Sequence, residues 1–87
     1  MNNDIEILKK KLVYRSQYRG TKEMDKLVGS FVKNCIDKLD YDELHELENF
    51  LDLDDDILYK LFNNQIKDSK SVNKSIIKMF KRFEYKL

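Results

Sequence analysis

The near absence of helix-breaking residues is the feature that most limits how this 87-residue chain can fold. It contains no proline and only two glycines, Gly20 and Gly29. Strands in small proteins are usually separated by turns rich in these residue types, whereas here apolar side chains recur at intervals of three and four. The sequence therefore predicts an all-α fold, a compact single-domain bundle of five short helices formed by residues 1–87.

Capping residues predict where the first two helices begin and end. A first helix is expected over about residues 4–17, capped by Asn3 or Asp4 and ended by Gly20 in a left-handed conformation. Thr21 would cap a second helix that runs to about Lys38. Its apolar positions cover more than one narrow stripe, so we expect it to be the central helix. These positions are Met24, Leu27, Val28, Phe31, Val32, Cys35, Ile36 and Leu39.

Similar signals predict three further helices. Asp40 and Glu43 form a capping-box pattern that opens a third helix, which ends near Leu51. The acidic residues at 52–56 suit the start of a fourth helix, because carboxylates are favourable at a helix N-terminus. The fourth helix would end around residues 63–64. A terminal helix of about residues 70–86 would be capped by Ser69 or Ser71.

Composition argues against several functional classes. Seventeen basic and sixteen acidic side chains nearly cancel, so no strong overall field attracts nucleic acid or anionic lipid. One cysteine, Cys35, and one histidine, His45, cannot supply an intramolecular disulfide or a Cys/His zinc set. No apolar run approaches the roughly 20 residues that span a bilayer, and no signal peptide is recognised. We therefore expect a protein of the bacterial cytoplasm with no membrane insertion and no metal site.

Three groups that could suggest chemistry have simpler structural interpretations. The acidic residues 52–56 lack the spacing and the glycine of a calcium loop. Cys35 falls on the apolar side of the second helix, where a thiol packs as a small hydrophobic group. His45 lies off the apolar stripe of the third helix, without a nucleophile beside it. The sequence thus predicts that the chain is not an enzyme.

The terminal helix has a basic face interleaved with aromatic residues. Such a pattern could bind nucleic acid or a membrane surface. The alternative is an ordinary terminal helix with buried phenylalanines and solvated lysines, and we favour that interpretation. The residues concerned are Lys70, Lys74, Lys78, Phe80, Lys81, Arg82, Phe83, Tyr85 and Lys86.

Two arginines, two tyrosines, one glycine and two carboxylates gather at the predicted junction of the first two helices. Tyrosine and arginine are the side chains most often found as interface anchors. Arg19 and Glu23 are expected to face outward on either side of Gly20. A side chain at Gly20 would strain the turn and hinder close approach by another protein. The junction is therefore a candidate interface, and this is compatible with Gly20 acting as a C-cap and Glu23 as a partner of the helix dipole.

This junction resembles the succinate dehydrogenase assembly factor 2 family, whose bacterial members are called SdhE. The family signature Arg-Gly-x-x-Glu is present at residues 19–23, followed by Met24 and Asp25. The Asp-rich residues 54–62 are similar to a later motif that precedes the fourth helix of the family. The resemblance covers about residues 8–64, and the chain departs from the family pattern at Tyr18, Ile57 and Leu61.

The resemblance implies a chaperone-like assembly factor whose partner-binding surface is formed by Arg19, Gly20, Glu23, Tyr18 and Asp25, with Arg15 at the rim. Such a protein would bind the flavoprotein subunit of succinate dehydrogenase, or of the related fumarate reductase, and promote covalent attachment of FAD, called flavinylation. FAD would belong to the partner, no cofactor would be held stably by this chain, and the free chain would be a monomer. On this hypothesis Gly20→Arg, Arg19→Ala and Glu23→Ala leave the helical fold intact while impairing flavinylation.

Two other functional classes stay open at the level of sequence. The chain could be an antitoxin or regulatory protein of a toxin pair, in which case a toxin would co-purify with it. Less favoured is a nucleic-acid-binding helical domain that uses the basic terminal helix. Its affinity would fall steeply with salt, because each phosphate contact releases counterions.

Overall fold

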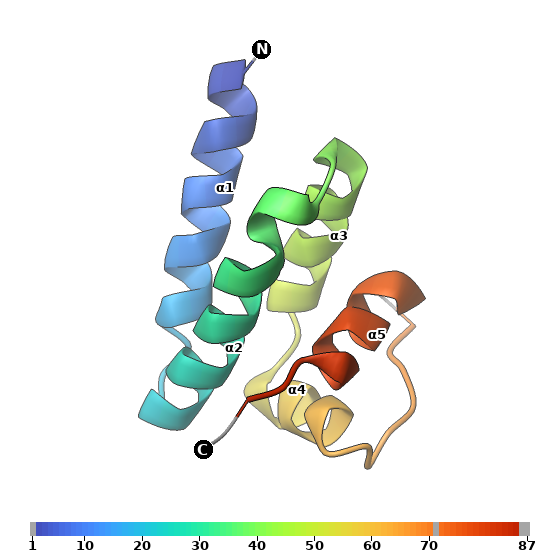
Figure 1. Cartoon of the computed structure of the whole chain (residues 1–87). Coiled ribbons are helices and arrows are strands. Elements are labelled where there is room, and N and C mark those ends of the chain that lie inside the picture. The colour runs from blue at the N-terminus through green and yellow to red at the C-terminus, as the bar shows by residue number, and fades with distance from the viewer. Residues whose placement is uncertain (1, 71, 86–87) are drawn as a thin grey trace.

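Helices make up the regular structure of the described residues, 2–70 and 72–85, in this computed structural model (Figure 1). The all-α prediction is confirmed, and no strand is present in the described residues. A short 3-10 turn, η1, continues the second helix, so the predicted helical run to Lys38 is also confirmed. The elements in chain order are α1 (Asn2–Gln17), α2 (Lys22–Cys35), η1 (Ile36–Lys38), α3 (Tyr41–Leu51), α4 (Asp55–Phe62) and α5 (Lys74–Arg82).

In Figure 1, α2 lies between α1 and the pair α4 and α5, and α1 also packs against α3. All eight apolar positions predicted for this helix and the turn after it are buried, as expected for a helix covered on two sides. Gly29 allows α1 to approach closely, because a Cβ atom there would lie 3.3 Å from Cγ of Gln17. Ser16, which is fully buried in α1, satisfies its hydroxyl by donating to the carbonyl of Val13 over 2.6 Å.

Phenylalanine rings join α2, α3 and α5 in the core. The ring of Phe31 in α2 lies 5.5 Å from that of Phe50 in α3 and 5.0 Å from that of Phe80 in α5, between centroids. Phe50 and Phe80 are themselves 4.9 Å apart in an edge-to-face arrangement. Such pairs add roughly 0.5–1.5 kcal/mol to the stabilisation from apolar burial. The phenylalanine of the terminal helix therefore packs inward, as predicted.

Two of the predicted caps are present as hydrogen bonds. The hydroxyl of Thr21 accepts from the amide of Met24 over 3.2 Å and closes the start of α2. At the start of α3, the Asp40 carboxylate accepts from the Glu43 amide over 2.8 Å, and the Glu43 carboxylate accepts from the Asp40 amide over 3.0 Å. The reciprocal pair is a complete capping box.

The predicted starts of the first and last helices are wrong. Helix α1 already begins at Asn2, so Asn3 and Asp4 lie inside its first turn and do not precede it. Helix α5 is shorter than the predicted residues 70–86. Asn73, not Ser69, is its cap and accepts from the amide of Ser75 over 2.8 Å. The alternative cap, Ser71, and residues 86–87 lie outside the described residues.

Tertiary contacts explain why α5 begins late. The Lys81 ammonium donates to the carbonyls of Ile66 and Lys67 over 3.0 and 2.7 Å. These hydrogen bonds tie the segment before α5 to the far end of that helix. The amide of Asn73 also donates to a carboxylate oxygen of Glu46 in α3, over 3.2 Å, which fixes the position of the helix start. Helix α4 ends as predicted, with Asn64 in the left-handed region at φ 58°.

No helix within residues 2–70 and 72–85 is both long and apolar enough to cross a membrane.

We predict that Phe31→Ala lowers the free energy of unfolding by about 3–5 kcal/mol, because it removes a buried ring and leaves a cavity. The measurement is urea denaturation followed by circular dichroism. Tyr41→Ala is the control, since this aromatic side chain is half exposed, and we expect a change below about 1 kcal/mol. Equal losses in the two variants would contradict a core centred on Phe31.

Candidate functional site: the junction of α1 and α2

The turn between α1 and α2 requires glycine at one position. Gly20 has φ +123°, a backbone conformation that other residue types rarely adopt. A Cβ atom built on Gly20 would meet nothing within 4 Å, so the restriction is conformational and the space beside the residue is open. The predicted positive φ is confirmed, although α1 itself ends three residues earlier, at Gln17.

Asp25, in the first turn of α2, holds this turn closed. One oxygen of its carboxylate accepts from the backbone amide of Arg19 and, over 3.3 Å, from that of Gly20. Both amides belong to a non-helical segment and would otherwise lack a partner in the chain. Asp25 therefore determines the shape of the turn from within, in addition to lying near the positive end of α2.

Arg19 points into the protein, and its guanidinium joins the turn to the junction of α3 and α4. Its Nε donates to Asp55 of α4 over 2.9 Å, and its side chain is only 11% exposed. Nη1 donates to the carbonyl of Leu51, the last residue of α3, and Nη2 to that of Leu53 over 2.5 Å. Carbonyls at the end of a helix have no partner further along it, so the fork of Arg19 satisfies groups that the helix leaves free.

The expectation that Arg19 faces outward is therefore wrong. It was based on the i, i+4 spacing of Arg19 and Glu23, which places two side chains on one face only inside a continuous helix. Here the turn at Gly20 separates the two residues, since α1 has ended and α2 starts at Lys22. The acceptors for Arg19 come from a distant part of the chain, and no local sequence pattern indicates them.

From the exposed residues at the junction we define a junction face of four: Tyr14, Tyr18, Gly20 and Glu23. The two tyrosines are 63% and 67% exposed, and their ring centroids lie 4.6 Å apart on one side of α1. Glu23 has no hydrogen bond or ion pair with any residue that the structure describes. The face therefore offers an aromatic pair, an open backbone position and an unpaired carboxylate.

Tyr14 was not among the predicted site residues. Sequence could have suggested it, because it precedes Tyr18 by one helical turn and lies away from the buried Leu12. A shallow hollow of about 300 Å³ adjoins the pair, lined by the two tyrosines with Arg15 and Arg19. The side chain of Arg15 is 41% exposed and forms an ion pair with Asp52 over 2.5 Å, so it lies at the rim.

The remaining reactive side chains lie elsewhere. Burial raises the pKa of the Cys35 thiol to about 11, so the thiol is protonated and weakly nucleophilic at neutral pH. His45 is exposed, with Nδ1 2.8 Å from Glu48 and its ring against Tyr41. Among the described residues, no group of three or more His, Cys, Asp or Glu side chains is placed to hold a metal ion.

We predict that Arg19→Ala destabilises the fold by about 2–4 kcal/mol, because it leaves Asp55 and two carbonyls without their donor. This replaces the expectation that the variant keeps the fold intact. Arg15→Ala is a matched control from the same helix end, and we expect a loss below about 1 kcal/mol because its ion pair is exposed to solvent. Urea denaturation measures both. A loss for Arg19→Ala no larger than that for Arg15→Ala would show that the guanidinium contacts contribute little.

Two proteins that carry the same name are similar to this chain. The chain is 37% identical over 83 residues to a protein named FAD assembly factor SdhE from Wigglesworthia glossinidia brevipalpis, covering 93% of this chain and 96% of that protein. A protein of the same name from Acetobacter pasteurianus is 38% identical over 47 residues, covering 54% of this chain and 43% of that protein. No solved structure matches the chain.

The sequence model of one family matches residues 10–84. The match includes the whole signature at residues 19–23 and continues past residue 64 through α5, further than the resemblance first indicated. With most of the chain matched, and with the relative from Wigglesworthia similar over nearly its full length, the chain belongs to the Sdh5 family, the flavinators of succinate dehydrogenase.

Proposed function

We propose that the junction face binds the flavoprotein subunit of succinate dehydrogenase and that this binding promotes covalent attachment of FAD to that subunit. One observation carries the choice of surface. Within the family signature, the side chain of Arg19 is largely buried and pairs with Asp55. Gly20 and Glu23 are exposed, and Glu23 has no partner among the described residues. A carboxylate held on a helix beside an open backbone position is suited to accept hydrogen bonds from another protein.

Each part of the junction face has a distinct role in this proposal. Glu23 accepts a charge-assisted hydrogen bond from the flavoprotein, an interaction worth roughly 1.5–3 kcal/mol. Gly20 lets the partner approach the turn, since no Cβ projects from it. Tyr14 and Tyr18 act as rigid aromatic anchors, with Arg15 at the rim. Arg19 and Asp25 hold the turn and so position Gly20 and Glu23.

The chain acts by selective binding and supplies no catalytic residue. It stabilises a minor conformation of the flavoprotein in which the partner's own FAD and accepting side chain are correctly oriented. The chain can shift the equilibrium only by the difference in its binding free energy for the two conformations of the flavoprotein. Each 1.4 kcal/mol of that difference raises the ratio of the favoured to the other conformation tenfold. FAD remains a group of the partner, and no cofactor is bound stably here.

In this proposal the chain is free as a monomer in the bacterial cytoplasm until it meets its client. In the same proposal, the flavoprotein subunit of fumarate reductase is a second client, to which FAD would be attached in the same way. Neither the antitoxin hypothesis nor the nucleic-acid hypothesis is supported by a specific feature of the junction. Recovery of a toxin with the purified chain, in place of a flavoprotein, would favour the antitoxin hypothesis.

We predict that Glu23→Gln reduces covalent FAD in the client at least five-fold, because the charged acceptor is lost while the shape of the side chain is kept. In-gel flavin fluorescence of the flavoprotein, in cells that carry each variant as the only copy, is the measurement. Asp42→Asn is the matched control, since Asp42 is an exposed acid in the first turn of α3 and its loss weakens the helix dipole interaction equally.

Deletion of the whole gene tests the function separately from the surface. If deletion abolishes flavinylation while Glu23→Gln and Tyr18→Ala both leave it at the wild-type level, the function holds and the junction face is the wrong surface. If deletion changes nothing, the assembly role itself is wrong for this chain.

A further inference from the structure

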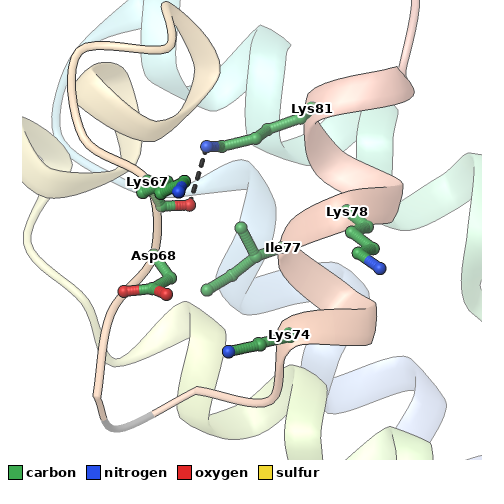
Figure 2. Close-up of a pocket in the computed structure, with 6 residues that line it drawn as sticks. All are labelled: Lys67, Asp68, Lys74, Ile77, Lys78 and Lys81. Atoms are coloured by element: carbon green, nitrogen blue, oxygen red, sulfur yellow. Dashed lines mark hydrogen bonds between the residues drawn. The ribbon is translucent and has the colours of Figure 1, made fainter.

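A second surface, remote from the junction in sequence, concentrates positive charge. A pocket of about 320 Å³ lies between α5 and the segment that precedes it, and Figure 2 shows its lining. Four lysines surround it against a single aspartate, Asp68, so three positive charges are in excess. The net charge of the whole chain is only +1, so this pocket is a local departure from a nearly neutral molecule. The lysines are Lys67, Lys74, Lys78 and Lys81.

Three of these ammonium groups have no partner among the described residues. Lys81 donates to the carbonyls of Ile66 and Lys67 and thereby holds the wall of the pocket in place (Figure 2). The other three lysines, Lys67, Lys74 and Lys78, are exposed and form no ion pair or hydrogen bond with any residue in the described ranges. The side chain of Ile77 projects from α5 toward Lys67 and Asp68 (Figure 2) and is buried, at 2% exposure, so the floor is apolar.

Two of these lysines are unfavourable for the stability of α5 itself. Lys74 and Lys78 are four residues apart on α5, and like charges at that spacing destabilise a helix by roughly 0.2–0.5 kcal/mol. Lys74 also occupies the first turn of α5, which has no acidic residue, so it faces the positive end of the helix. Residues that are unfavourable locally are often placed for function.

We propose that this lysine pocket binds an acidic segment of a partner protein. The spacing of the lysines along α5 indicates the class of ligand. Lys74, Lys78 and Lys81 follow one side of α5 over about 10 Å at 1.5 Å per residue, which is too long for one phosphate group to contact. Carboxylates on alternate residues of an extended peptide are about 7 Å apart, so two of them can reach neighbouring lysines of the row.

The chemistry of the lining also favours a peptide over nucleic acid or a compact phosphate ligand. No arginine lines the pocket to grip a phosphate with a two-pronged contact, and lysine acts as a point charge on a flexible stem. No aromatic side chain lines it to stack on a base, which single-stranded nucleic acids normally require. An acidic peptide needs neither feature.

The test uses the full chain and a fluorescein-labelled peptide of eight glutamates, with binding followed by fluorescence anisotropy at low and high salt. The pocket variant is Lys74→Gln/Lys78→Gln. The matched control is Lys22→Gln/Lys26→Gln, because Lys22 is likewise the first residue of a helix and Lys26 follows it by four. Both pairs are exposed, and both variants lose two positive charges.

We predict that the pocket variant binds the peptide at least five-fold more weakly than the wild type, whereas the control changes less than two-fold. Circular dichroism should show that both variants remain folded, since glutamine and lysine have similar helix propensities. Equal weakening in the two variants would mean that the peptide senses only net charge, and the proposal would fail. It would also fail if inorganic pyrophosphate or a labelled uridine oligonucleotide bound the pocket more tightly than the peptide.

Discussion

The guanidinium of Arg19 is the contact on which the arrangement of the junction depends. It reaches from the turn after α1 to the end of α3 and to Asp55 at the start of α4, and it satisfies a carboxylate and two carbonyls at once. Only arginine has a planar fork of donors that can serve three acceptors in different directions. Because the side chain is largely buried, these hydrogen bonds are shielded from water and fix the turn relative to the second half of the chain.

The fixed turn separates two roles within the five-residue signature. Arg19 is used for structure, and Asp25, just beyond the signature, secures the backbone amides of the turn. Gly20 and Glu23 are exposed, and the internal contacts of the turn hold them in fixed positions relative to each other. A binding surface of small area benefits from such rigidity, since less conformational freedom is lost when the partner arrives.

The two proposed surfaces differ in chemistry. The junction face presents aromatic rings and one carboxylate, whereas the lysine pocket on α5 presents an excess of positive charge around an apolar floor. They draw on different residues and on opposite ends of the chain, so each can be altered without changing the other. The net charge of the chain is nearly neutral because it sums over basic and acidic regions, so it does not indicate the local excess of lysine at the pocket.

The sequence by itself determined the features that depend on neighbouring residues. The cap at Thr21, the capping box at Asp40, the positive φ at Gly20 and the buried apolar face of α2 all follow from local chemistry and helical spacing. Tertiary structure alone decided where Arg19 points, because its acceptors lie 32 to 36 residues further along the chain. It likewise decided where α5 begins, since the amide of its cap Asn73 donates to Glu46 of α3. Contacts between distant residues leave no periodic pattern in a single sequence, and so only the folded chain reveals them.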